Sequence, residues 1–480
     1  YPDWSYFDHP PLVAWLIRLT TFGGEVSLDG VVRLGALLIG TLNTWLIYRI
    51  TRRLSGGCER SGLISALLYT GSIYCFVISG TFIMPDTPLT LFWLLAFDQF
   101  SYLLPLRHIT RRDQWRMILA WVYVGLAMLS KYSGAYLGGA AGLYILLFNR
   151  TWFSRWSLYV APVVSLVVFL PVILWNVEYD FITFRFHGAR VTSQSSVNWL
   201  YFGREIFGGI FYNNPVNWVV SLLSIVVWRR VRYVSAEIYR FILVFSLPMI
   251  ALFLGISLTR ETLPHWASPA YVSLIVLSGC YLSTISRGLF WAKVSAGFVS
   301  VIALLGILQI NFGLIDLDSR EGVSDLGRMD FSLDTYGWAQ GGALFAQYVA
   351  GDTILGDSGD VTLVNYSWHD LAHLDCYFSL PYGFRTMAMG DISSTHYWEW
   401  INRERGGFSV GDSFYLVTTS RYSLDPLEIY GSDFERITSA DTLPIYRRGD
   451  HVYNFYVYRL IGLRSDSRFF ESQISGVMDK

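Results

Sequence analysis

The chain has 480 residues, of which 53% are hydrophobic, 17% aromatic and only 15% charged. Soluble domains carry about 25% charged residues, so this composition excludes an ordinary soluble protein and is typical of a membrane protein. The net charge of −1 gives no indication of nucleic-acid binding. The four cysteines show no spacing that predicts a disulfide framework.

Residues 1–30 are predicted to form a partial first outer loop that ends in an interfacial helix. The stretch YFDHPPLVAWLIRL contains two prolines at 10–11, which fix φ and remove two backbone donors, so we expect a helix to begin at Pro11 or just after. The apolar run that follows is too short to cross a bilayer and is typical of a helix lying in the membrane surface. The prolines would then hold Asp8 and His9 at the mouth of a cavity. The chain starts at Tyr1 without methionine, and we expect that a preceding segment is missing.

Residues 31–312 contain ten apolar runs, and a spanning helix needs about 17–25 apolar residues. The predicted spans are 31–50, 61–80, 87–104, 116–130, 133–148, 157–175, 205–228, 239–258, 267–285 and 290–312. One set of alternate loops carries sixteen Lys and Arg side chains and the opposite set carries seven. The positive-inside rule places the richer set in the cytoplasm, so the tail after 312 is expected on the outer side.

Ionisable residues on the predicted outer side gather in stretches rich in aromatic residues, proline and glycine. These stretches are FIMPDTPL (82–89), LSKYSGA (129–135), FITFRFHGAR (181–190) and TRETLPHWASPAY (259–271). Each charged residue alone could be an interfacial anchor, but loops converging on one face indicate one site. Asp86 has a second reading as the N-cap of a helix that starts at Thr87. Asp98 lies toward the cytoplasmic end of its span, and we interpret it as a bundle-interior hydrogen-bonding residue.

Residues 313–480 alternate between strand-like and helix-like runs and predict a small α/β domain. The expected strands lie at 352–358, 361–369, 412–420 and 454–462, and the expected amphipathic helices at 338–350 and 369–380. No phosphate-binding glycine motif occurs in this region. His369 and His373 are spaced as a possible zinc pair, although with no evident third ligand a surface pair is the preferred interpretation.

The motifs YFDHPPL, MPDTPL, GLAMLSKYSG, LPVILWN with FRFHGAR, LPHWASPAY and FYVYRLIGL occur in this order along nearly the whole chain. In these motifs the chain resembles bacterial membrane glycosyltransferases of the GT-C fold. These enzymes are related to aminoarabinose transferase and to the dolichyl-phosphate-mannose–protein mannosyltransferases (glycosyltransferase family 39-like). The resemblance implies a mainly α polytopic bundle with a C-terminal periplasmic α/β domain. It also implies an acidic pair upstream of YFD, which would precede Tyr1 and would include the principal base.

The resemblance further implies a sugar donor linked to polyprenyl phosphate. The departing phosphate needs fixed cations or a divalent metal, and a carboxylate must accept the proton of the acceptor hydroxyl. The family's usual lysine is replaced here by His9, which as a neutral imidazole is a weaker anion ligand. The residues assigned on this basis are Asp8 and Asp86 as catalytic, His9, Lys131, Arg190 and Arg260 as phosphate-binding, Tyr6, His187, His265 and Trp266 as cavity-lining, and Asp8 with His187 as possible metal ligands.

The function that we expect is transfer of a sugar from a polyprenyl-phosphate donor to a lipid, glycan or protein acceptor. The reaction would take place on the periplasmic face of the bacterial inner membrane. Two alternatives remain open from the residues. A lipid-linked-sugar transporter or flippase would line a path through the membrane with ionisable residues, and no internal repeat supports it. A non-catalytic envelope assembly protein would tolerate replacement of Asp8 and Asp86.

Overall fold

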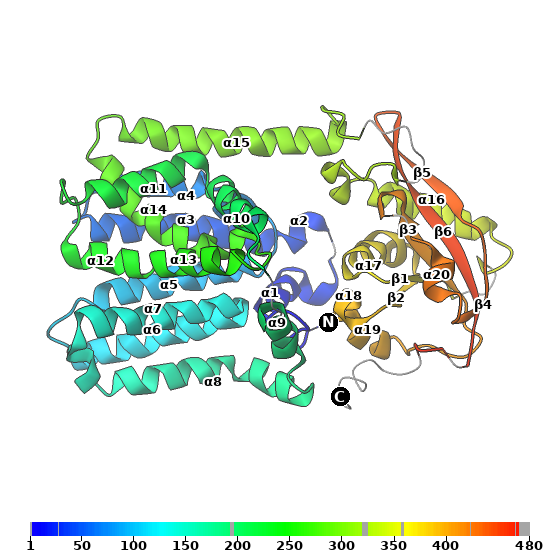
Figure 1. Cartoon of the computed structure of the whole chain (residues 1–480), viewed down its shortest axis with the longest axis horizontal. Coiled ribbons are helices and arrows are strands. Elements are labelled where there is room, and N and C mark those ends of the chain that lie inside the picture. Colours follow the sequence, from blue (N-terminus) through cyan, green and yellow to red (C-terminus); the bar gives the residue numbers. More distant parts are fainter. Residues whose placement is uncertain are drawn as a thin grey trace. The chain divides into compact units, whose positions relative to one another are not determined.

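The computed structural model describes residues 2–26, 28–192, 196–318, 325–356, 360–422, 424–465 and 467–469, and it describes no side chains for residues 189–192. The chain divides into two compact units, Tyr1–Ala303 and Leu304–Lys480 (Figure 1). The first unit is helical, and the second contains the sheet.

The first unit is a bundle of helices joined by short turns. Its elements are α1 (Leu12–Thr20), η1 (Phe22–Gly24), α2 (Asp29–Val32), α3 (Leu34–Leu54), α4 (Glu59–Thr70), η2 (Tyr74–Ile78), α5 (Asp86–Leu103), α6 (Arg111–Ser130), η3 (Tyr132–Gly134), α7 (Ala135–Phe148), η4 (Arg150–Ser154), α8 (Ser157–Glu178), α9 (Ile182–Thr192), α10 (Trp199–Tyr212), α11 (Pro215–Val227), α12 (Ala236–Val244), α13 (Leu247–Ser257), η5 (Pro264–Ala267), α14 (Ser268–Ser283) and α15 (Gly288–Phe312), the last of which crosses the boundary between the units. The predicted helix start next to the proline pair is confirmed, because α1 begins at Leu12.

Helical structure occupies most of each range that the sequence predicts as a span. Among the described residues, four helices are long and apolar enough to cross a membrane: Ser157–Glu178, Ala236–Ser257, Pro264–Ser283 and Gly288–Phe312. The pair α10 and α11 would make a fifth if it is one broken span, and Tyr132–Phe148 is a shorter apolar helix.

The predicted span at 205–228 is not one continuous helix, because α10 and α11 meet at an angle of 96°. Asn214 at the break has φ 71°, and its side-chain oxygen accepts a hydrogen bond from the backbone N–H of Val216. Pro215 then occupies the first position of α11, where its missing N–H costs no hydrogen bond. The Asn214 amide donates to the carbonyl of Gly71 at 2.6 Å, so the break is fixed to the neighbouring helix α4.

The core of the bundle lies around α5, which packs against α3 and α6. Trp93, Phe97 and Phe100 on α5 are at most 1% exposed. Because α5 and α6 are consecutive packed helices, the start of α5 and the end of α6 come to the same end of the bundle. Figure 1 shows α1, α2 and α9 at that end. Asp86 and Lys131 therefore meet although they lie on separate helices.

The second unit is an α/β domain with a six-stranded sheet in its described part. Its strands are β1 (Thr362–Asn365), β2 (Arg385–Ala388), β3 (Phe414–Thr419), β4 (Phe434–Ile437), β5 (Asp441–Arg447) and β6 (Asp450–Leu463), and its helical segments are η7 (Phe331–Thr335), α16 (Trp338–Gly351), α17 (Trp368–Leu374), η9 (Asp375–Ser379), η10 (Leu380–Tyr382), α18 (Ile392–Thr395), α19 (Trp398–Glu404), η11 (Ser420–Tyr422) and α20 (Pro426–Tyr430). The strand order is β2-β1-β3-β6-β4, with β5 also on β6. The strands β2, β1 and β3 are parallel, and β6 runs antiparallel to its neighbours.

Three of the four predicted strands are confirmed as β1, β3 and β6, and both predicted helices are present as α16 and as α17 with η9. The predicted strand at 352–358 is wrong for residues 352–356, which form a turn, and residues 357–359 lie outside the described residues. There the side chain of Asp352 accepts the backbone N–H of Ile354, a local bond that competes with strand pairing.

Candidate functional site

Asp86 is the most deeply buried carboxylate of the predicted site. It is the first residue of α5 and is 0% exposed. One carboxylate oxygen accepts a hydrogen bond from the Tyr74 hydroxyl at 2.9 Å, and the other accepts one from the Lys131 ammonium at 2.8 Å. The reading of Asp86 as an N-cap is therefore wrong, since the cap position is held by Pro85 and the carboxylate is committed to side chains.

Lys131 leaves the end of α6 in an extended conformation, with φ −158° and ψ 139°. Its side chain is 14% exposed and reaches Asp86 across the gap between α6 and α5. Gly134 permits this tight turn, because a Cβ there would lie 2.4 Å from the backbone of Ala127. The glycine in the LSKYSGA stretch therefore lets the chain fold back close to α6, which fixes where Lys131 emerges.

His265 and His9 extend this pair into a larger group of ionisable side chains. His265 lies on η5, close enough to interact electrostatically with Lys131, Asp86 and His9. Its ring is 6.0 Å from the ring of Tyr212 at the end of α10. Three of the four outer stretches, 82–89, 129–135 and 259–271, thus contribute one residue each, and the YFDHPPL stretch contributes His9 with its neighbour Asp8. We call Asp8, His9, Asp86, Lys131 and His265 the ionic cluster.

The YFDH stretch forms a turn whose neighbours hold it in place. The backbone N–H of Tyr6 donates to the carbonyl of His9 at 3.1 Å, and Phe7 is buried with its ring 4.7 Å from that of Phe186. His9 Nδ1 lies 2.9 Å from Asp8 Oδ2, and both side chains are partly exposed, at 40% and 27%. The burial of Phe7 thus leaves Asp8 and His9 at the accessible edge of the cluster.

The expected metal pair of Asp8 and His187 does not fit the geometry. His187 Nε2 lies 2.9 Å from the backbone carbonyl oxygen of Asp8, whereas a carboxylate oxygen of Asp8 contacts His9. Among the described residues, no group of three His, Cys, Asp or Glu side chains is arranged to hold a metal ion.

The remaining predicted site residues surround the cluster to different degrees. Tyr6 is half-buried, and burial raises its pKa above the usual range. Trp266 is half-buried on η5 and packs its ring 6.1 Å from that of Phe253 on α13. Arg260 is half-buried on the segment between α13 and η5. The side chain of Arg190 lies outside the described residues, although its backbone belongs to α9.

Two other predicted groups have structural roles. Asp98 contacts both Arg49 and Arg53, at 2.9 and 2.8 Å, which confirms its interpretation as a bundle residue. His369 Nδ1 lies 3.2 Å from Asp370, and His373 Nδ1 lies 2.9 Å from the His369 carbonyl oxygen. Among the described residues, these two histidines belong to no group of three His, Cys, Asp or Glu side chains that could hold a metal ion. All four cysteines are free thiols.

Sequence reasoning missed two residues that the structure brings into play. The sequence placed Tyr74 inside an apolar span. In the structure Tyr74 belongs to the π-helical segment η2, and its hydroxyl donates a hydrogen bond to Asp86. A π-helical turn in a broken apolar run is a feature that often marks functional sites, but the sequence alone does not reveal it. The second missed residue is Glu205, which stands alone as an acid in the apolar stretch WLYFGREIFGG.

Comparisons with known proteins show which proteins this chain resembles in sequence and in fold. Residues 8–175 match the family model of dolichyl-phosphate-mannose-protein mannosyltransferase. Lipid A galacturonosyltransferase RgtD from Rhizobium johnstonii is 26% identical over 284 residues, a match that covers 58% of this chain and 56% of that relative. The chain thus matches little more than half the length of this curated relative.

The crystal structure of ArnT from Cupriavidus metallidurans bound to undecaprenyl phosphate superposes with a TM-score of 0.58 at 18% identity, covering 95% of this chain and 90% of that chain. The apo form of the same protein gives 0.55 at 16% identity, covering 94% and 88%. The fold is therefore that of the GT-C class of membrane glycosyltransferases. Within that class, the resemblance to the aminoarabinose transferase and protein mannosyltransferase group is confirmed, and the chain is a multi-pass membrane protein.

Proposed function

We propose that the chain is a glycosyltransferase that moves a sugar from a polyprenyl-phosphate donor to an acceptor on the periplasmic face of the inner membrane. The acceptor is a glycolipid, a glycan or a protein. The observation that carries the proposal is the buried pair of Asp86 and Lys131, joined to His265 and His9 at the end of the bundle where α1 lies. Support for the donor class comes from the relatives, one of which binds undecaprenyl phosphate.

The proposed chemistry follows from the charges of the cluster. When the acceptor oxygen attacks the anomeric carbon, the bond from that carbon to the phosphate oxygen breaks and the phosphate gains negative charge. Lys131, with His9 and Arg260 as further donors, stabilises this charge because fixed cations outside bulk water interact strongly with a developing anion. Asp86 is a positioning residue in this scheme, since its carboxylate is buried and holds the Lys131 ammonium.

Asp8 is the carboxylate with access to a substrate, since its side chain is 27% exposed. We assign it the role of orienting the acceptor hydroxyl and accepting its proton. His9 beside it offers a ring N–H that can donate a hydrogen bond to the donor phosphate. The two side chains would thus face the acceptor and the donor from one short turn.

Mass spectrometry of the cell envelope tests this proposal. A strain that lacks the gene is complemented with the wild type, with Asp86→Asn or with Asp98→Asn. The wild type and Asp98→Asn should restore a lipid, glycan or protein with the mass of one additional sugar. Asp86→Asn should restore about one hundredth of it or less, because the Lys131 ammonium loses its anchor. Identical envelopes in the deletion and complemented strains, or full restoration by Asp86→Asn, would contradict the proposal.

A further inference from the structure

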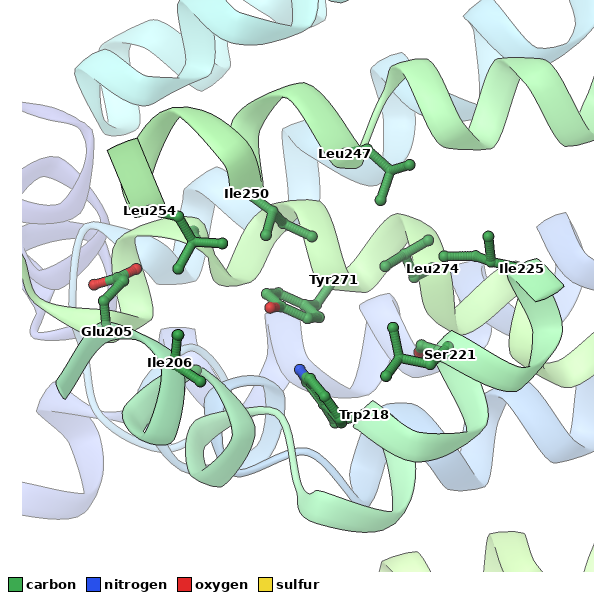
Figure 2. A pocket seen from close by; sticks show the side chains of 13 residues that line it. Glu205, Ile206, Trp218, Ser221, Ile225, Leu247, Ile250, Leu254, Tyr271 and Leu274 are labelled. Atoms are coloured by element: carbon green, nitrogen blue, oxygen red, sulfur yellow. The ribbon is translucent and has the colours of Figure 1, made fainter. Parts of the chain in front are cut away.

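A second region of the helical unit has the features of a ligand site. A cavity of about 220 Å³ lies between the broken pair α10–α11 and the helices α13 and α14 (Figure 2). Its walls are mainly apolar, with Leu222, Ile225, Ile250, Leu254 and Leu274 among them. The 96° bend between α10 and α11 opens this space, because two straight packed helices would close it with side chains.

Glu205 gives this apolar cavity one ionisable group. Figure 2 shows it at one end of the cavity, near Ile206 and Leu254. The residue is 4% exposed, and one carboxyl oxygen accepts a hydrogen bond from the Thr262 hydroxyl at 2.6 Å. Within the described part of the chain, no cation pairs with Glu205, and its other carboxyl oxygen accepts no hydrogen bond. The Tyr271 hydroxyl lies close enough to Glu205 to interact electrostatically.

Glu205 differs from three other buried acids of the bundle in how its charge is compensated: Asp86 and Asp98 have counterions, and Asp113 accepts hydrogen bonds from the backbone N–H and the hydroxyl of Thr110. Asp86 and Asp98 each pair with at least one cation within 3 Å. Burying a carboxyl group costs free energy when one of its oxygens accepts no hydrogen bond. An ionisable residue at membrane depth usually contacts a ligand or a partner. The neighbouring Arg204 does not offset this cost, since it pairs with Glu261.

The cavity adjoins the ionic cluster through η5. Ala267 lines the cavity, whereas His265 on the same short segment belongs to the cluster. The helix α10 packs closely against η5 at Gly208, because a Cβ at this position would lie 2.3 Å from the ring of Pro264. A molecule with its reacting group at the cluster could therefore place an apolar chain in the cavity.

We propose that this cavity binds a hydrocarbon chain that carries a hydroxyl group, and that this hydroxyl donates a hydrogen bond to Glu205. The occupant is an acyl chain of a lipid acceptor, an assignment that rests on the proposed function. A polyprenyl tail offers no donor to the free carboxyl oxygen of Glu205. A phosphate would be repelled by the carboxylate. A hydroxylated acyl chain can pack its hydrocarbon part against the apolar walls and donate its hydroxyl hydrogen bond to Glu205.

Photocrosslinking to the purified full chain in lipid nanodiscs tests the inference. The probe is a diazirine-bearing methyl ester of a hydroxylated fatty acid, and crosslinked peptides are mapped by mass spectrometry. The competitors are methyl 3-hydroxytetradecanoate, methyl tetradecanoate and undecaprenyl phosphate. Crosslinks are expected on peptides of α10, α13 and α14. The hydroxylated ester should compete at about tenfold lower concentration than the plain ester, as one hydrogen bond to a carboxyl group allows.

The variants assign this preference to Glu205. Glu205→Leu should reduce the tenfold preference to about onefold, while Glu261→Gln, which changes an exposed acid nearby, should leave it intact. Equal competition by the two esters, an unchanged preference in Glu205→Leu, or stronger displacement by undecaprenyl phosphate would overturn the inference. Asp86→Asn should retain the preference, so a failure of the transferase proposal is recognised separately from a failure at the cavity.

Discussion

The two ends of α5 carry acids that have similar partners and different surroundings. Asp98 binds Arg49 and Arg53, whose side chains are 50% and 39% exposed. Asp86 binds Lys131 and Tyr74, and its own side chain is 1% exposed. The two arginines at Asp98 are each partly exposed, and either one can neutralise the acid. The single ammonium at Asp86 has no substitute in direct contact among the described residues.

This difference separates an ion pair that fastens helices from one that serves a site. At Asp98, α3 and α5 are joined by a buried acid and two arginines that are partly exposed, so the loss of one arginine should cost little. At Asp86, both charges are withdrawn from solvent, so each depends on the other for a low energy. The desolvation cost of burying the Lys131 ammonium is consistent with a role in binding a substrate anion.

Replacing Lys131 should produce the largest effect. Lys131→Met leaves the Asp86 carboxylate buried without its cation, which typically costs about 3–5 kcal/mol of stability. We expect a large fall in the thermal unfolding temperature of the purified protein in detergent, together with loss of sugar transfer. Arg49→Met is the matched control and should change stability by less than about 1 kcal/mol, because Arg53 still pairs with Asp98. Equal destabilisation by the two variants would break the comparison.

Replacing His9 should have a smaller effect that is confined to activity. The contact of His9 with Asp8 is partly exposed, so His9→Gln should change stability by less than about 1 kcal/mol. If its imidazolium contacts the donor phosphate, transfer at low donor concentration should fall about tenfold, the value of one charge-assisted hydrogen bond. Initial rates against donor concentration measure this change. His108→Gln, in an exposed loop, serves as the control, and an unchanged rate in His9→Gln would exclude the assigned role.

Cysteine labelling tests on which side of the membrane the Asp86 end and the Asp98 end of the bundle lie. In a cysteine-free background, Glu25→Cys near the Asp86 end should react with a membrane-impermeant maleimide added to intact spheroplasts. Ser55→Cys at the end of α3 should react only after permeabilisation, since the last two turns of α3 carry Arg49, Arg52 and Arg53. The reverse pattern would place the ionic cluster on the cytoplasmic side and contradict the proposed direction of the site.

The sequence predicted the members of the cluster better than their contacts. Asp86 and Lys131 stood out because each charge is adjacent to proline, glycine or aromatic residues near the end of an apolar run. Their direct pairing was not predictable, since 45 positions separate them and it depends on how α5 and α6 pack. Tyr74 was hidden because a tyrosine in an apolar run is most often a core residue.

Errors in the predicted elements have local physical causes. The break between α10 and α11 was missed although Asn213, Asn214 and Pro215 together are a start signal for a new helix. The strand β5 was missed because Pro444 lies inside it, and proline argues against a strand. There β5 pairs with β6 alone among the described strands, so an edge position tolerates the missing donor.

The helix α15 couples this protein to the thickness of its membrane. Only 11% of its most apolar window is buried within the chain, so its apolar side chains would be solvated by lipid tails. Its 25 residues extend to about 37 Å, which exceeds the roughly 30 Å of a typical hydrocarbon layer. Such a helix relieves the mismatch by tilting or by thickening the bilayer around it, and its orientation therefore depends on acyl-chain length in the host membrane.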